Sequence, residues 1–185
     1  MKPQEKEIKN RSRSGLSVKE ITLFAFLGAL MFASKMIMEI LPNMHLLAMF
    51  IALYTIVFRK KALYPIYVFV LVTGIYSGFA VWWVPYLYIW TVLWGVVMLL
   101  PKNMSRPVQA VVYPIVCSLH GFLFGILYAP AQALFFGLNF EQTLAWIAAG
   151  LYFDLIHGIS NLFAGILVLP LKEAIGHLEK SLHKR

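Results

Sequence analysis

Apolar residues fill most of the chain in six long runs, separated by short connections that are polar or contain proline. A helix that crosses a bilayer needs roughly 20 predominantly apolar residues, and several of these runs reach that length. The pattern therefore predicts an all-α membrane protein with six transmembrane helices. The helices are expected at residues 18–41, 44–58, 62–79, 84–100, 108–129 and 140–170.

Prolines and polar pairs mark several of the predicted ends. Pro42 should close the first helix, and Pro114 should kink the fifth because a proline removes one backbone hydrogen bond. The fifth helix should end before Pro130, which leaves residues 131–138 as a short apolar segment on the membrane surface or over a cavity. Asn139 and Gln142 have the spacing of a capping box that opens the sixth helix.

The distribution of basic residues indicates how the helices are oriented. If six helices alternate in direction, 15 of the 16 Lys and Arg residues fall on one side, and the three connections on the other side hold none. Basic residues collect in cytoplasmic loops, so both termini are predicted to be cytoplasmic. The domain organisation is then a basic tail at 1–17, a six-helix domain at 18–172 and a second tail at 173–185. The expected location is a prokaryotic plasma membrane, as a multi-pass protein.

Composition agrees with a membrane protein. Hydrophobic residues make up 61% of the chain and charged residues 13%, about half of what a soluble domain carries. The net charge of +8 would also suit nucleic acid, but the positive-inside pattern explains it without a nucleic-acid partner. Cys117 is the single cysteine, so neither an intrachain disulfide nor a thiolate metal cluster is expected.

Two charged residues interrupt the first helix. Lys35 lies about 21 Å past the inner edge of that helix at 1.5 Å per residue, and Glu39 follows on the same side. Charges inside a bilayer cost at least a few kcal/mol unless they are paired or hydrated. The two residues are therefore either a structural ion pair that reaches the outer surface or the polar wall of an outward-facing cavity.

A second group of polar residues lies on the fifth and sixth helices. Asp154, His157 and Asn161 occupy positions i, i+3 and i+7, which form one stripe on the sixth helix, and His120 lies at a similar depth on the fifth. Two interpretations are open. The residues form either a hydrogen-bonded cluster that fixes helix packing or a ligand or proton site. No metal site is expected, because no helical His pair with an acid has ligand spacing.

Aromatic and small residues complete the candidate features. Trp82, Trp83 and Tyr86 lie at the outer mouth of the fourth helix, where they either belong to an interfacial aromatic belt or stack on a flat ligand ring. On the first helix, small residues recur every four positions. They let another helix approach closely, and their ridge points roughly 100° away from the two charged residues. The ridge comprises Ala25, Ala29 and Ala33, with Gly28 beside them.

The chain resembles a known family in its size, its predicted topology and two motifs. Ala25-Phe-Leu-Gly-Ala29, extended to Ala33, is similar to the Ala-x-x-x-Ala pattern in the first helix of the substrate-binding S components of energy-coupling factor (ECF) transporters. Asn43-Met-His-Leu-Leu-Ala, after a proline turn, also resembles that group. The resemblance covers roughly residues 18–172.

The resemblance implies a transport subunit and not an enzyme. S components bind a vitamin or similar micronutrient at the outer side, then join a transmembrane coupling subunit and two cytoplasmic ATPases. The chain has no G-x-x-x-x-G-K-[ST] motif, so ATP would be used by the partner ATPases and no cofactor is expected here. The small residues Ala25, Gly28, Ala29 and Ala33 would contact the coupling subunit. The candidate substrate-binding residues are Lys35, Glu39, Asn43, Trp82, Trp83, Tyr86, His120, Asp154, His157 and Asn161.

Two other functions stay open from the sequence. Asp154, His157 and His120 could form the site of a small intramembrane enzyme, because a histidine near a carboxylate is a usable general base. No G-x-S-x-G or H-E-x-x-H motif accompanies them. A stand-alone transporter or channel is the other alternative, although no inverted repeat is evident.

Overall fold

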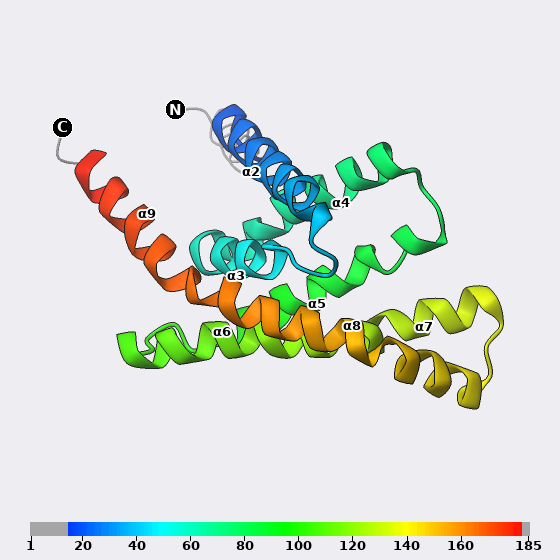
Figure 1. The fold of residues 1–185 in the computed structure, drawn as a ribbon. Coiled ribbons are helices and arrows are strands. Elements are labelled where there is room, and N and C mark those ends of the chain that lie inside the picture. The colour runs from blue at the N-terminus through cyan, green and yellow to red at the C-terminus, as the bar shows by residue number, and fades with distance from the viewer. Residues whose placement is uncertain (1–14, 183–185) are drawn as a thin grey trace, which may run out of the picture.

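The computed structural model describes residues 15–182, with side chains to residue 177. In that part of the chain all regular elements are helical, which confirms the predicted all-α class (Figure 1). The predicted tail at 1–17 lies mostly outside the described residues, as do the basic residues 184 and 185. The elements are α2 (Val18–Ile37), η1 (Met38–Ile40), α3 (Leu47–Phe58), η2 (Arg59–Ala62), α4 (Leu63–Ser77), η3 (Val81–Trp83), α5 (Tyr86–Leu99), α6 (Arg106–Phe122), α7 (Phe124–Phe136), α8 (Phe140–Ile166) and α9 (Val168–Leu182).

Within residues 15–182, four helical segments are long and apolar enough to cross a membrane: Val18–Ile40, Val81–Leu99, Arg106–Phe136 and Phe140–His177. The two remaining predicted spans correspond to α3 and α4, which have 12 and 15 residues. At 1.5 Å per residue these helices are about 18 and 23 Å long, shorter than the hydrocarbon core of about 30 Å. The structure therefore supports a membrane protein with four helices of spanning length.

Helix α3, the shortest α-helix among the described residues, lies at the centre of the bundle. Eight of the 12 residues of α3 are buried, and α3 contacts α5, α6, α8 and α9. An apolar helix without a polar face is stable when other helices surround it on all sides. The outer helices show the opposite arrangement, because large apolar side chains such as Phe26, Leu134 and Phe163 are mostly exposed. Such a surface suits lipid, which solvates apolar side chains.

Close backbone contact joins α6 to α8, which run side by side (Figure 1). A Cβ atom added to Gly121 would lie 2.8 Å from the Cα of Gly158, so only glycine fits at this crossing. Gly165 similarly allows the backbone of Pro114 to approach. Small residues drive helix association in lipid because they let backbones pack closely. The Ser118 hydroxyl adds a hydrogen bond of 2.9 Å to the Gly158 carbonyl.

The predicted fifth helix differs from the structure in where it breaks and ends. Helix α6 continues through Pro114, and the interruption comes at Leu123. Helix α7 then includes Pro130 and continues to Phe136, so the predicted end before Pro130 and the separate segment at 131–138 are both wrong. The Asp154 carboxylate explains the new start, because both of its oxygens accept from the amide of Gly125, at 3.0 and 3.1 Å. It thereby supplies a partner for a free N–H in the first turn of α7.

The sixth predicted helix is also divided. The Asn139–Gln142 capping box opens α8 as predicted, with reciprocal hydrogen bonds of 2.9 Å. The chain turns at Leu167 and continues as α9, so residues from 173 to 182 are helical where a tail was predicted. Figure 1 shows α9 extending beyond the bundle.

Basic residues gather at one end of the bundle, here called the basic end. Lys61 pairs with Glu20 at the start of α2. Arg106 at the start of α6 pairs with Glu173 of α9, with nitrogen–oxygen distances of 2.7 and 3.0 Å. These contacts bring segments distant in sequence to the same end of the molecule.

Candidate functional site

A pocket of about 200 Å³ opens where the connection between α2 and α3 meets α5, α7 and α8. It is smaller than the roughly 300–1,000 Å³ typical of sites for drug-sized ligands, so it suits a small metabolite. We call it the polar pocket. It is lined by Lys35, Met38, Glu39, Leu41, Pro42, Asn43, Met44, His45, Tyr86, Phe124 and His157.

Lys35 and Glu39 both line the polar pocket but do not pair. Lys35 continues the face of α2 that carries buried Gly28 and Met31, at i, i+3 and i+7, so it points toward the bundle. Glu39 falls in the 3-10 turn that follows α2 and is exposed. No ion pair joins the two side chains, although the structure describes both of them. The ammonium and the carboxylate thus both remain free to meet a ligand.

A sharp turn carries the chain from α2 to α3 and forms one wall of the polar pocket. Asn43 adopts a left-handed conformation, with φ of 58°, which asparagine tolerates better than most residues. Pro42 precedes it, at the position where the sequence predicts the end of the first helix. The turn places His45 beside the residues of α8.

Two histidine rings meet in this pocket. The centroids of His45 and His157 are 4.4 Å apart with the rings nearly perpendicular, and the Phe124 ring lies 4.7 Å from His157. The Nδ1 atom of His45 and the Nε2 atom of His157 are buried without a hydrogen-bond partner. A buried polar atom left unpaired costs about 1–3 kcal/mol, so a ligand that bonds to either atom would regain that energy.

Two further candidate residues, His120 and Asn161, are buried but lie outside the lining of the polar pocket. The Nε2 atom of His120 is 3.1 Å from the carbonyl oxygen of Ile89, and its ring lies 5.8 Å from that of Trp90. Asn161 is fully buried, and its amide has no hydrogen-bond partner among the described residues. Neither His120 nor Asn161 lines the pocket.

Asp154 has a structural role. Its two carboxylate oxygens are both bound to the amide of Gly125, and a Cβ atom at Gly125 would lie 2.4 Å from one of them. No hydrogen bond joins Asp154 to His157 or His120 in the described part of the chain. In this structure the Asp154 carboxylate is thus bonded to the backbone of α7 and not to either histidine.

Of the three aromatic candidates, one lines the polar pocket and two do not. Tyr86 lines the polar pocket. The ring of Trp82 meets Tyr86 edge-on, with centroids 5.6 Å apart, and its carbonyl accepts from the Tyr128 hydroxyl at 3.1 Å. Trp83 turns toward α4, where its indole nitrogen donates to the Val70 carbonyl at 2.8 Å. Trp82 and Trp83 do not line the pocket, and their hydrogen bonds fix the connection between α4 and α5.

Trp83→Phe should consequently lower stability and leave ligand affinity unchanged. The substitution removes the bond to Val70 and keeps an aromatic ring against Phe79, whose centroid is 5.0 Å away. One such bond is worth about 1 kcal/mol, which lowers the melting temperature by about 2–4 °C for a protein of this size. Thermal unfolding in detergent measures the effect. A loss of ligand affinity at an unchanged melting temperature would show that Trp83 contacts the ligand.

The pocket chemistry suits an organic ligand. It offers an ammonium donor, a carboxylate acceptor, two imidazoles and an aromatic face within one small volume. Among the residues that the structure describes, no group of three His, Cys, Asp or Glu side chains has a geometry that could hold a metal ion.

Comparison with known proteins finds no relative: no family model matches the chain, and no protein of described function and no solved structure resembles it significantly. The case for function therefore depends on the geometry of this chain alone. The sequence prediction of the site missed His45. The sequence could have indicated His45 by its position, because it is a polar residue between the Pro42-Asn43 turn and the start of the largely buried helix α3.

Proposed function

We propose that this protein is a membrane-embedded substrate-binding subunit of the ECF type. In this role it would capture a small metabolite on the outer side and deliver it inward with a coupling subunit and two ATPases. One observation carries the proposal: the first helix combines an exposed alanine face with a charged residue that reaches the polar pocket from a different face. A transport subunit of this class needs both surfaces.

The alanine face is open to a partner. Ala25, Ala29 and Ala33 are all exposed along α2, while Phe24 and Met31 are buried on its other side. Gly28 is different, because it is buried against α4, where an added Cβ would lie 2.6 Å from Val68. The proposed interface therefore consists of the three alanines without Gly28. A narrow, smooth ridge of this kind suits close helix–helix contact in lipid.

The proposal includes six membrane crossings with both termini in the cytoplasm. Between the basic end and the polar pocket the chain passes in alternating directions, with Glu20, Lys61 and Arg106 at one end and Lys35, Tyr86 and Phe124 at the other. The short helix α3 can serve as a crossing because it is enclosed by its neighbours. With the basic end inside, as the positive-inside rule requires, the polar pocket lies toward the outside.

The pocket composition defines the class of substrate. Lys35 would bind a carboxylate of the substrate, and Glu39 or the free nitrogen of a histidine would bind its polar or cationic part. Phe124 and Tyr86 would contact a ring. A small, vitamin-like molecule with an acidic group and a ring satisfies all of these contacts.

Lys35→Met should weaken substrate binding about tenfold or more. Methionine keeps the length of the side chain but removes the charge, and a hydrogen bond to a charged group is worth about 1.5–3 kcal/mol. Calorimetric titration with the purified substrate measures the loss. Lys19→Met is the matched control, because Lys19 lies exposed on the first turn of α2, far along the helix from the pocket. Equal affinity in both variants would remove Lys35 from the site.

The experiment that tests the function is purification from native membranes without added ligand. Mass spectrometry should identify a small molecule that is retained by the wild-type protein, together with a membrane coupling subunit and two ATPases. A protein that purifies alone and accumulates a solute when reconstituted alone in liposomes would instead be a self-sufficient transporter.

A further inference from the structure

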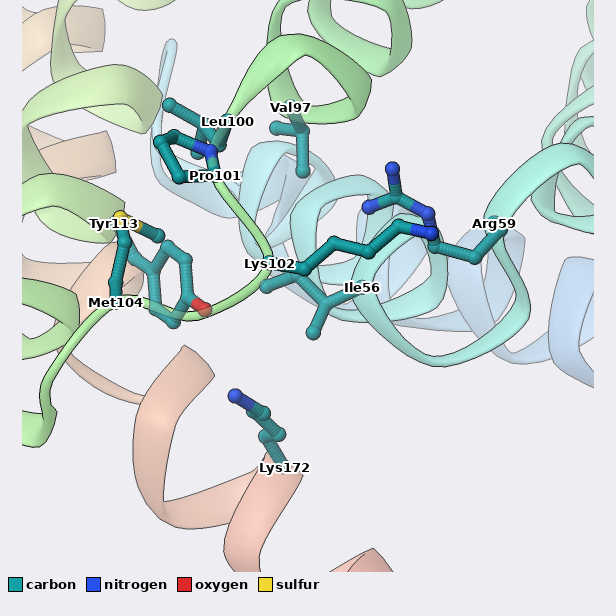
Figure 2. Close-up of a pocket in the computed structure, with 9 residues that line it drawn as sticks. All are labelled: Ile56, Arg59, Val97, Leu100, Pro101, Lys102, Met104, Tyr113 and Lys172. Atoms are coloured by element: carbon teal, nitrogen blue, oxygen red, sulfur yellow. The ribbon is translucent and has the colours of Figure 1, made fainter.

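A second pocket, of about 280 Å³, lies at the basic end and is separate from the polar pocket (Figure 2). We call it the basic pocket. It is formed by the end of α3 with η2, the end of α5, the connection to α6, and α9. Its lining residues are Ile56, Arg59, Val97, Leu100, Pro101, Lys102, Met104, Tyr113 and Lys172.

Three cationic side chains converge on this space. In Figure 2 Lys102 extends toward Arg59, and Lys172 points into the pocket from α9. The nearby carboxylates at this end are engaged elsewhere, since Glu20 pairs with Lys61 and Glu173 pairs with Arg106. No described carboxylate lies within ion-pair distance of Arg59, Lys102 or Lys172. Like charges brought together without a counter-charge repel one another, and an anion between them removes that repulsion.

Neutral groups hold two of these cations in place. Arg59 donates from one guanidinium nitrogen to the Met98 carbonyl at 3.1 Å, which leaves most of its five N–H donors available. Lys172 donates to the Gln109 side-chain oxygen at 2.6 Å and lies 5.9 Å from the centroid of the Tyr113 ring. Both cations are therefore positioned before any ligand arrives.

The chemistry of the pocket matches a phosphate group. A guanidinium can bind two phosphate oxygens at once, and lysine ammoniums bind phosphate as point charges. Ile56, Val97 and Leu100 supply an apolar part of the lining, and Val97 is buried. The pocket lies where apolar helices end and basic turns begin. If these helices span a bilayer, such ends lie at the depth of the lipid headgroups. A phosphate joined to an apolar body would satisfy both parts of the pocket.

We propose that the basic pocket binds the phosphate of an anionic phospholipid, with its charged headgroup between Arg59, Lys102 and Lys172 and its apolar part over Ile56 and Leu100. The basic pocket shares no lining residue with the polar pocket. It would fix the basic end at the membrane surface and tie α9 to η2 and to the end of α5 through one bound molecule.

The test compares two double variants of equal charge. Lys102→Gln with Lys172→Gln removes two cations from the pocket. Lys19→Gln with Lys60→Gln removes two exposed cations outside it. The full-length protein in detergent is titrated with phosphatidylglycerol and, separately, with phosphatidylcholine, and bound lipid is counted by native mass spectrometry. Basic residues near a membrane contribute about 1 kcal/mol each, so the pocket variant should bind phosphatidylglycerol about thirtyfold more weakly than the wild type.

The outcomes separate the possible sources of the anion. Weaker phosphatidylglycerol binding in the pocket variant alone, with phosphatidylcholine bound weakly by all proteins, supports the lipid site. Competition by inorganic phosphate at millimolar concentration would assign the pocket to a soluble phosphate compound. Equal losses in both double variants would show only a general charge effect and would overturn the proposal. Because Lys102 is exposed, Lys102→Gln alone should fold normally and still lose about fivefold, and an unchanged affinity there would also overturn it.

Discussion

Ala29→Trp should abolish assembly with the coupling subunit while leaving the isolated protein folded and able to bind its substrate. Ala29 lies at the middle of the exposed alanine face, on the side of α2 opposite buried Met31. An indole there would hold a partner helix several ångströms away and remove most of the packing contacts that stabilise association in lipid. We expect the affinity for the partner to fall at least about a hundredfold, which corresponds to about 3 kcal/mol.

The matched control is Ala148→Trp, which places the same side chain at an exposed position on α8. Co-purification of the partner subunits measures assembly, and thermal unfolding with substrate titration measures the state of the subunit itself. Normal assembly of the Ala29 variant would exclude the alanine face as the interface. Equal losses in both variants would mean that any bulky substitution on the lipid-facing surface prevents assembly.

Gly121→Ala should destabilise the fold by about 3 kcal/mol, although alanine favours helices in general. The added methyl group would lie 2.8 Å from three backbone atoms of His157 and Gly158. Backbone atoms cannot rotate away, so α6 and α8 would have to separate along their shared surface. The melting temperature should fall by about 6–12 °C, on the basis of about 2–4 °C per kcal/mol.

Gly150→Ala is the control for this prediction. Gly150 also lies within α8, but an added Cβ there meets nothing within 4 Å. The control should keep or slightly raise the melting temperature, because alanine has the higher helix propensity. A Gly121 variant that behaves like the Gly150 variant would show that α6 and α8 are not packed as closely as the structure describes.

Much of the helical framework could be predicted from the apolar runs and from the prolines and polar residues that end them. The turn at Pro42-Asn43 and the Asn139 capping box were predicted because both depend on local residues. The break at Leu123 was missed, because its cause lies 31 residues away along the chain: Asp154 binds the amide that a new helix leaves free. The sequence likewise predicts a helix end at Pro130, because no neighbouring residue indicates that α7 continues past it.

Only part of the polar pocket could be predicted from the sequence, again because contacts between distant segments determine the rest. The sequence singles out Lys35 and His157 as polar residues within apolar helices, and both line the polar pocket. Periodicity could not distinguish Trp83, whose indole finds a carbonyl on α4, from Tyr86, which faces the pocket. Whether a buried polar side chain meets a backbone group or a cavity depends on which helices become neighbours, and a single sequence does not specify those neighbours.

The bond between Asp154 and Gly125 also determines which wall of the polar pocket can move. It ties the start of α7 to the middle of α8, next to the contact between the rings of Phe124 and His157. If the protein binds a solute as proposed, we therefore expect the opposite wall, the turn from Met38 to His45, to move when the solute enters or leaves.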